Sequence, residues 1–196
     1  MLRHRLASFV TALAITAATA AMAQDQGNQG NQPAGCSLSA SVVNNVLGKL
    51  ASVVQLNNGG LFSPNRMWAA VVDRQGVLCS VTRSDPDAWP GSRDIAIAKA
   101  FSANAFSSHT LALSTANLYG PTQPGGSLYG LNNSNPFNAN FNAQGSGNGS
   151  AVGGIITFGG GVALYSNGQV IGGLGVSGDT SCATMPLPIA CAHKPA

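Results

Sequence analysis

Residues 153–178 read GGIITFGGGVALYSNGQVIGGLGVSG and predict one long β-hairpin. Two apolar runs, 155–164 and 170–176, flank the letters SNG, in which Asn-Gly favours a tight turn because both residues tolerate positive φ. Glycine weakens a strand, so the glycine run 159–161 indicates either a bulge or a place where another backbone or a flat ligand approaches closely. The other segments are placed around this hairpin.

Upstream of the hairpin, the sequence predicts a first helix and a second, shorter hairpin. Residues 37–55 carry an apolar stripe at helical spacing, and Ser37 or Ser39 can cap the helix start. The runs 67–73 and 77–82 are rich in β-formers and flank a DRQG turn. These segments supply one helix and two antiparallel strands.

The middle of the chain predicts further helices and a long loop. Ser92 can cap a helix from residue 93 to about 107, whose inward side is expected to carry Ile95, Ala98, Phe101, Ala105 and Phe106. A short helix is expected over 111–118, before a Gly/Asn/Ser/Pro-rich loop over 119–150 whose aromatic residues argue against full disorder. The order of elements predicts an α+β fold: a single domain with an antiparallel β-sheet and helices packed on it.

The start of the chain has the features of an export signal. A basic RHR start precedes an apolar, alanine-rich run and an A-x-A cleavage site that ends at Ala23. We expect residues 1–23 to be a signal peptide, 24–35 a flexible leader and 36–183 the domain, located in the periplasm or outside the cell. The alternative is an N-terminal anchor helix, but the run is short for a membrane span and no later run approaches that length.

The composition excludes several classes of function. Charged residues make up 8% of the chain and the formal net charge is +3, whereas typical domains have roughly 25% charged residues. Nucleic-acid binding is disfavoured because it needs clustered Lys and Arg. All six acidic residues are Asp, so hydrolysis by paired carboxylates has little raw material. Few charges also mean little self-repulsion, which favours a homo-oligomer.

Four cysteines make disulfide bonds possible in an exported protein. Cys36, Cys79, Cys182 and Cys191 allow three pairings. The first choice is Cys36–Cys182, which would tie the start of the first helix to the end of the last strand. Free buried thiols are the alternative, because free cysteine is among the most buried residue types.

Two blocks of the sequence resemble the heme-binding GlcG/HbpS family, also called the heme-degrading domain family. One is GGIITFGGGVALY, a turn and VIGGLGVSGD, and the other is MWAAVVDRQGVLC followed by PGSRDIAIAKA. The blocks occur in the family's order and the resemblance covers roughly Cys36 to Cys182. It implies an α+β fold of the same character, heme as the cofactor, heme contacts at the first helix, and an oligomer.

The C-terminus departs from that family, in which a closing helix packs on the sheet. Residues 184–196 read TMPLPIACAHKPA, and three prolines prevent a regular helix. With suitable codons, a one-base shift would turn residues 184–191 into DHAIAYCV, which resembles the family's closing helix. We therefore hypothesise an irregular, frameshifted tail, and an unbroken frame on resequencing the end of the gene would refute this idea.

Histidine is the first candidate for a metal ligand to heme iron. His109 is the only histidine of the family-like region, and His193 lies in the altered tail. The alternative for His109 is structural, because a charged imidazole is favourable at the C-terminal end of a helix. The predicted first helix has no histidine, although the resemblance implies heme contacts there.

Other cofactor-binding candidates are tyrosines and basic residues. Tyr119 and Tyr165 could ligate iron, as could Tyr129, although buried tyrosine more often packs with its hydroxyl satisfied. Arg93 or Lys99 could pair with a heme propionate, and the alternative for both is a solvated helix face.

The sequence therefore predicts an exported heme-binding protein, rather than an enzyme, that stores, transports or senses heme. The alternatives are a heme-degrading or small-metabolite enzyme, and a structural oligomer that has lost its ligand. The hairpin 153–178 carries apolar residues on both sides of its pleat, so we expect it to contribute to an interface between copies.

Overall fold

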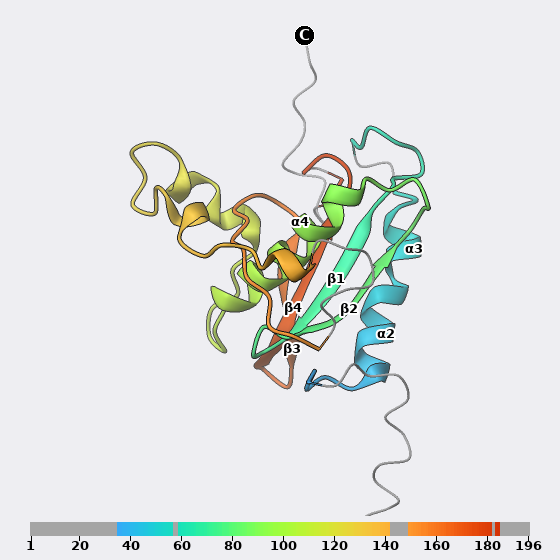
Figure 1. Ribbon diagram of the computed structural model, residues 1–196, viewed down its shortest axis with the longest axis horizontal. Coiled ribbons are helices and arrows are strands. Elements are labelled where there is room, and N and C mark those ends of the chain that lie inside the picture. The colour runs from blue at the N-terminus through green and yellow to red at the C-terminus, as the bar shows by residue number, and fades with distance from the viewer. Residues whose placement is uncertain (1–34, 57–58, 142–148, 182, 185–196) are drawn as a thin grey trace, which may run out of the picture. The chain divides into compact units, whose positions relative to one another are not determined.

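The centre of the fold is a four-stranded antiparallel sheet with the strand order β2-β1-β4-β3 (Figure 1). This computed structural model describes residues 35–56, 59–141, 149–181 and 183–184. The strands are β1 (Trp68–Asp73), β2 (Leu78–Arg83), β3 (Gly161–Ser166) and β4 (Gln169–Ser177). Both predicted hairpins are present, and pairing of β1 with β4 joins them into one sheet. The predicted α+β fold is confirmed.

The turn between β3 and β4 has the conformation that its sequence predicts. Asn167 and Gly168 have φ of 50° and 75°, as a type I′ hairpin turn requires. The predicted first strand is too long, however, because β3 begins only at Gly161. Gly160 has a φ of +117°, and upstream of it the backbone N–H of Ile156 donates to Ser102 Oγ (2.8 Å) rather than to a neighbouring strand.

The helices cover both faces of the sheet. On one face, α2 (Ala40–Gly48) and α3 (Leu50–Val53) form a core with alternate residues of β1. On the other, α4 (Pro90–Ala105) packs on the intervening residues. The predicted first helix is thus two helices, and Ser39 caps α2 by accepting a hydrogen bond from the Val42 N–H.

Helix α4 lies directly against the glycines of β4. A Cβ atom on Gly175 would overlap the carbonyl oxygen of Ala96, and one on Gly173 would overlap that of Ala100. Gly161 in β3 likewise faces the carbonyl oxygen of Lys99, at 2.5 Å from where its Cβ would lie. The glycine pattern therefore marks close approach of another backbone, one of the alternatives that the sequence left open.

The expected burial of α4 needs two corrections. The helix starts at Pro90 after Trp89, so Ser92 is not its cap but a buried residue inside the first turn. Ala105, expected inward, is exposed. The simple amphipathic stripe fails because α4 is covered on two sides: the sheet lies on one, and the segment before β3 lies on the other, where Gly154 approaches Ala98.

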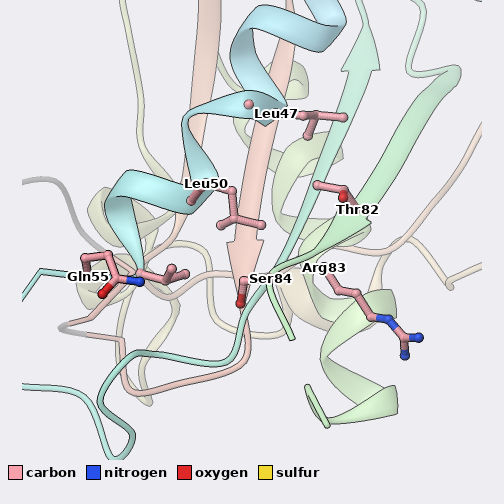
Figure 2. A pocket seen from close by; sticks show the side chains of 9 residues that line it. Leu47, Leu50, Gln55, Thr82, Arg83 and Ser84 are labelled. Atoms are coloured by element: carbon pink, nitrogen blue, oxygen red, sulfur yellow. The ribbon is translucent and has the colours of Figure 1, made fainter. Parts of the chain in front are cut away.

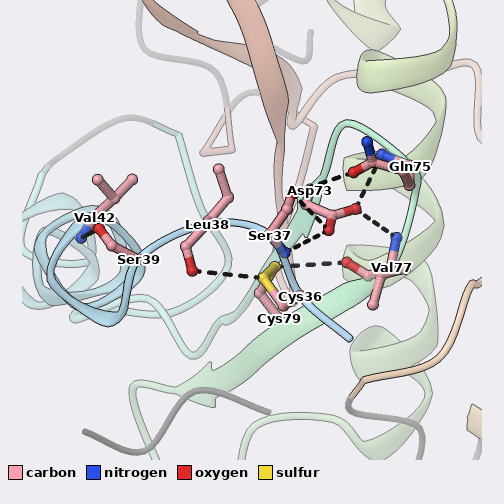
Figure 3. The surroundings of a disulfide bond; sticks show 9 residues. All are labelled: Cys36, Ser37, Leu38, Ser39, Val42, Asp73, Gln75, Val77 and Cys79. Atoms are coloured by element: carbon pink, nitrogen blue, oxygen red, sulfur yellow. Dashed lines mark hydrogen bonds between the residues drawn. A yellow bond between two sulfur atoms is a disulfide. The ribbon is translucent and has the colours of Figure 1, made fainter. Parts of the chain in front are cut away.

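A disulfide bond joins Cys36 to Cys79, with a Cα–Cα distance of 5.2 Å (Figure 3). The prediction of at least one disulfide is confirmed, but the first-choice pairing Cys36–Cys182 is wrong. The segment before α2 runs beside β2 because Asp73 holds it there: the N–H and hydroxyl of Ser37 both donate to Asp73 Oδ2, at 2.8 and 3.0 Å. Cys182 and Cys191 lie outside the described residues.

The long loop forms a series of short 3₁₀ turns where it is described. These are η1 (Thr115–Leu118), η2 (Gly120–Thr122), η3 (Leu131–Asn133) and η4 (Ala139–Phe141). Only η1 remains of the helix predicted over 111–118. The predicted signal peptide, most of the leader and residues 185–196 of the tail lie outside the described residues. Among the helices that are described, none has the length and apolar character to cross a membrane.

Candidate functional site

A pocket of about 280 Å³ lies between the first helices and the end of β2 (Figure 2). The helical side supplies Leu47, Gly48, Leu50, Ala51, Val54 and Gln55, and the strand side supplies Thr82, Arg83 and Ser84. Leu47, Leu50 and Val54 are buried core residues that form its apolar wall. Gly48 and Ala51 are exposed at its edge. The pocket is thus open to solvent on one side and apolar on the other.

The strand side of the pocket is polar. Ser84 Oγ donates to the carbonyl oxygen of Asn65 (3.2 Å) and accepts from the N–H of Met67 (2.9 Å). Arg83 contributes to the lining, yet its side chain points away from Leu50 and Gln55 (Figure 2). Its guanidinium instead lies 5.6 Å from the centre of the Trp68 ring, on the opposite face of the sheet.

Two of the predicted site residues, His109 and Tyr165, lie close together near the β3–β4 turn. His109 is exposed, and its Nδ1 accepts a hydrogen bond from the N–H of Val170 (3.0 Å). Val170 is the strand partner of Tyr165, whose hydroxyl donates to the carbonyl oxygen of Ser108 (2.7 Å). Both side chains thus attach the segment after α4 to the hairpin.

The other predicted site residues do not join them. Arg93 is buried in the first turn of α4 beside Asp94, 3.6 Å away. Burial lowers the pKa of Arg93, and the Asp94 carboxylate opposes that effect. Tyr119 is exposed at the start of the long loop. None of the five predicted residues lines the pocket beside α2 and α3.

Lys99 is fully buried between α4 and the sheet, so it does not lie on a solvated helix face. Its Nζ donates to the carbonyl oxygen of Val176 (3.0 Å) and lies 4.9 Å from the centre of the Phe158 ring. Burial lowers the pKa of Lys99 to about 8. The ammonium is therefore held by a carbonyl dipole and a ring face, which only partly replace its hydration.

The buried Lys99 predicts a specific dependence of stability on pH. Below pH 8 the folded protein bears the full cost of burying the charge, because Lys99 is protonated in both the folded and unfolded states. Between pH 8 and 10.5 only the unfolded state keeps the proton, so stability rises with pH by a total of about 3 kcal/mol from this group.

Urea unfolding between pH 7 and 10.5 measures this effect against Lys99→Met, which has no ammonium to bury. Wild type should gain stability relative to Lys99→Met as the pH rises. Lys49→Met is the matched control, since Lys49 is exposed, and it should follow wild type. Parallel curves for wild type and Lys99→Met would contradict the expected pKa of Lys99.

One cluster of possible metal ligands occurs among the described residues, and its ligand atoms already take part in a disulfide bond and in hydrogen bonds. Ligand atoms of Cys36, Asp73 and Cys79 lie within 4.8 Å of one another. The two sulfurs are joined in the disulfide. Asp73 Oδ1 also accepts hydrogen bonds from the N–H groups of Gln75 and Val77, both at 3.0 Å. The cluster stabilises the fold and has no free ligand set.

The sequence alone does not predict this pocket, although part of its signal is visible there. Leu47, Leu50 and Val54 belong to the predicted apolar stripe of the first helix. A stripe of this kind predicts burial against something, but its spacing does not say how much of it the sheet covers. Thr82, at the end of a predicted strand, and Ser84, two residues beyond it, carry no signal for a pocket.

An antiparallel sheet covered by helices on both faces, with an apolar pocket beside its first helices, defines a small α+β domain with a candidate ligand site. The chain belongs to the family described as haem degrading protein HbpS-like, whose family model matches residues 62–184. The family resemblance seen in the sequence is thereby confirmed.

Three comparisons place the chain among its relatives. It is 37% identical to the corrinoid adenosyltransferase PduO of Citrobacter freundii over 109 residues, which is 56% of this chain but only 26% of PduO. An uncharacterized 15.0 kDa protein in the dhaT-dhaS intergenic region of the same organism is 36% identical over 111 residues, 57% of this chain and 63% of that protein. The crystal structure of a PduOC:heme complex matches with a TM-score of 0.55 and 29% identity, covering 76% of this chain and 87% of that chain.

The pocket fits part of a heme and not the whole group. Its apolar wall suits the edge of a flat macrocycle, and its volume of about 280 Å³ lies just below the ~300–1,000 Å³ typical of ligand pockets. The lining includes no His, Cys, Met or Tyr, which are the usual protein ligands of heme iron. The described lining therefore offers contacts to the ring and none of the usual ligands to the iron.

Proposed function

We propose that this protein is an exported, non-enzymatic heme-binding protein that stores, transports or senses heme. The main support is the apolar pocket beside α2 and α3, the place where the family resemblance implies heme contacts. The similarity to a domain whose structure is described as a heme complex supports the same ligand. The pocket is lined by no Asp, Glu, His, Lys or Cys, which favours binding over acid–base catalysis.

The N-terminal signal pattern and the Cys36–Cys79 disulfide support export. Structural disulfides persist in the periplasm and outside the cell and are rare in the cytosol. The competing function is heme degradation, which the description of the family favours. Adding a reductant and oxygen to the heme-loaded protein separates the two. Persistent heme absorbance supports binding, whereas loss of the Soret band with a new bilin-like absorbance supports degradation.

Hemin titration of the purified chain and of Gly48→Trp tests the position of the site. Gly48 lines the pocket and is exposed, and a Cβ added there would meet no atom within 4 Å. A bulky side chain can therefore obstruct the pocket without straining the core. We expect wild type to show a Soret band and Gly48→Trp to bind hemin about tenfold or more weakly, a change of about 1.4 kcal/mol.

Gly91→Trp is the matched control for this substitution. Gly91 is also exposed and helical, its added Cβ would also meet no atom within 4 Å, and it does not line the pocket. Its hemin affinity should equal that of wild type. Equal weakening in both variants would place the heme elsewhere, and the absence of any Soret change in wild type would reject heme binding.

We also propose that the protein self-associates through the edge of the sheet formed by β3. Val162 and Leu164 of this edge strand are only half buried, and the strand has one neighbour in the sheet. Unpaired edges with apolar side chains favour pairing with another copy. Val162→Lys should shift the mass measured by light scattering towards the monomer, and a monomeric wild type at high concentration would refute the proposal.

A further inference from the structure

We propose that the pocket beside α2 and α3 recognises the apolar edge of a tetrapyrrole and not its metal, so that metal-free protoporphyrin binds as well as heme does. This inference rests on the proposed function, because it concerns how the same site selects its ligand. It assigns the pocket a ligand class that is defined by the ring and its substituents.

The residues that line the pocket carry the first part of the argument. Leu47, Leu50 and Val54 present aliphatic groups, while Thr82 and Gln55 present neutral hydroxyl and amide groups. Aliphatic side chains gain free energy by covering an apolar ring edge irrespective of the atom at the ring centre. A ligand inserted by its edge also keeps its central metal away from the deepest part of the pocket.

Histidine also provides little for an iron atom in the part of the chain that the structure describes. His109 is the one histidine there, and it lies near the β3–β4 turn, where its Nδ1 accepts a hydrogen bond from Val170. A neutral imidazole that accepts through Nδ1 carries its proton on Nε2. Neither nitrogen then has a lone pair for iron, and ligation would require His109 to give up its bond to the backbone of β4.

The charges near the pocket determine which edge can enter it. Arg83 is the charged residue of the lining, and its guanidinium lies over Trp68 on the opposite face of the sheet, where Nη1 donates to the carbonyl oxygen of Pro86 (3.1 Å). A carboxylate inserted into the pocket would lose hydration without gaining a cation, which is costly. The ring must therefore enter by an edge without carboxylates. Heme and protoporphyrin have such an edge, whereas uroporphyrin carries carboxylates on all sides.

Three probes test this inference on the purified chain: hemin, protoporphyrin IX and uroporphyrin. Hemin is followed by its absorbance, and the two metal-free porphyrins are followed by their fluorescence. We expect the affinities of hemin and protoporphyrin to lie within about threefold of each other, a difference in binding free energy below about 0.7 kcal/mol. Uroporphyrin should bind at least about tenfold more weakly than either, a difference above about 1.4 kcal/mol. Gly48→Trp should weaken hemin and protoporphyrin equally, and Gly91→Trp should weaken neither.

The outcomes distinguish this inference from the proposed function. If hemin binds but protoporphyrin binds more than about tenfold more weakly, heme binding stands and the inference is overturned. The same holds if His109→Ala or His193→Ala changes the Soret maximum and weakens hemin alone, because a protein ligand then holds the iron. Uroporphyrin binding as tight as that of protoporphyrin would overturn the role of the apolar edge. If neither hemin nor protoporphyrin binds, both proposals fail together.

Discussion

Replacing Cys36 and Cys79 together by alanine should lower the free energy of unfolding by about 4 kcal/mol and the melting temperature by roughly 10 °C. The bond joins residues 43 positions apart, so in the chain-entropy model its removal greatly enlarges the unfolded ensemble. It also attaches the segment before α2 to β2, beside the Ser37–Asp73 hydrogen bonds. Calorimetry of wild type and the double variant measures the loss.

Reduction and a second variant provide the controls for the disulfide. A reductant should lower the melting temperature of wild type by a similar amount and affect the Cys36→Ala/Cys79→Ala variant much less. Cys182→Ala should have the melting temperature of wild type, because it keeps the bond between Cys36 and Cys79. If Cys182→Ala melted as early as the double variant while Cys79→Ala melted like wild type, the pairing of Cys36 with Cys79 would be refuted.

Gly175→Val should destabilise the protein by more than about 4 kcal/mol, enough to prevent accumulation of folded protein. The added Cβ would overlap the carbonyl oxygen of Ala96 and lie 2.5 Å from the backbone nitrogen of Ala100. These are backbone atoms of α4, so no side-chain rotation relieves the clash. Either α4 separates from the sheet or β4 loses its pairing with β1, and both changes expose the core.

Gly48→Ala is the matched control, since both positions are glycines of regular elements and differ in the space around them. An added Cβ at Gly48 meets no atom within 4 Å, and alanine favours a helix over glycine by about 0.8–1.0 kcal/mol. Gly48→Ala should therefore be as stable as wild type or slightly more stable. Soluble yield and urea unfolding measure both variants, and wild-type stability of Gly175→Val would refute the close packing of α4 on β4.

Local sequence signals were sufficient for much of the fold. The Asn167-Gly168 turn, the two hairpins and the Ser39 cap depend on interactions between neighbouring residues, which are visible along the chain. The limits of β3 and the start of α4 were predicted less well. Before Gly160 the chain leaves the sheet, where the Ile156 N–H bonds to Ser102 of α4. Pro90 begins the helix before Ser92 because proline suits the first helical position, a local signal that the prediction of a Ser92 cap did not use.

The candidate site was less accessible to sequence analysis. His109 and Tyr165 were predicted as heme ligands because of their side-chain chemistry. In the structure, both side chains form hydrogen bonds that attach the segment after α4 to the hairpin. The pocket is built from leucines, a valine and neutral polar residues that have no chemical signature of their own. Only their arrangement around an uncovered end of β2 makes them a candidate site.

The sequence by itself determined the α+β class, the family and the presence of cysteines able to pair, and it left a bulge or a close approach as the two explanations of the hairpin glycines. Only the tertiary structure decided that α4 is what approaches Gly173 and Gly175, that Cys79 is the partner of Cys36, and that Lys99 is buried with its ammonium bonded to the carbonyl oxygen of Val176. The physical reason is the range of the interactions. Turns and caps form between residues a few positions apart, whereas packing, disulfide pairing and desolvation depend on which distant segments meet.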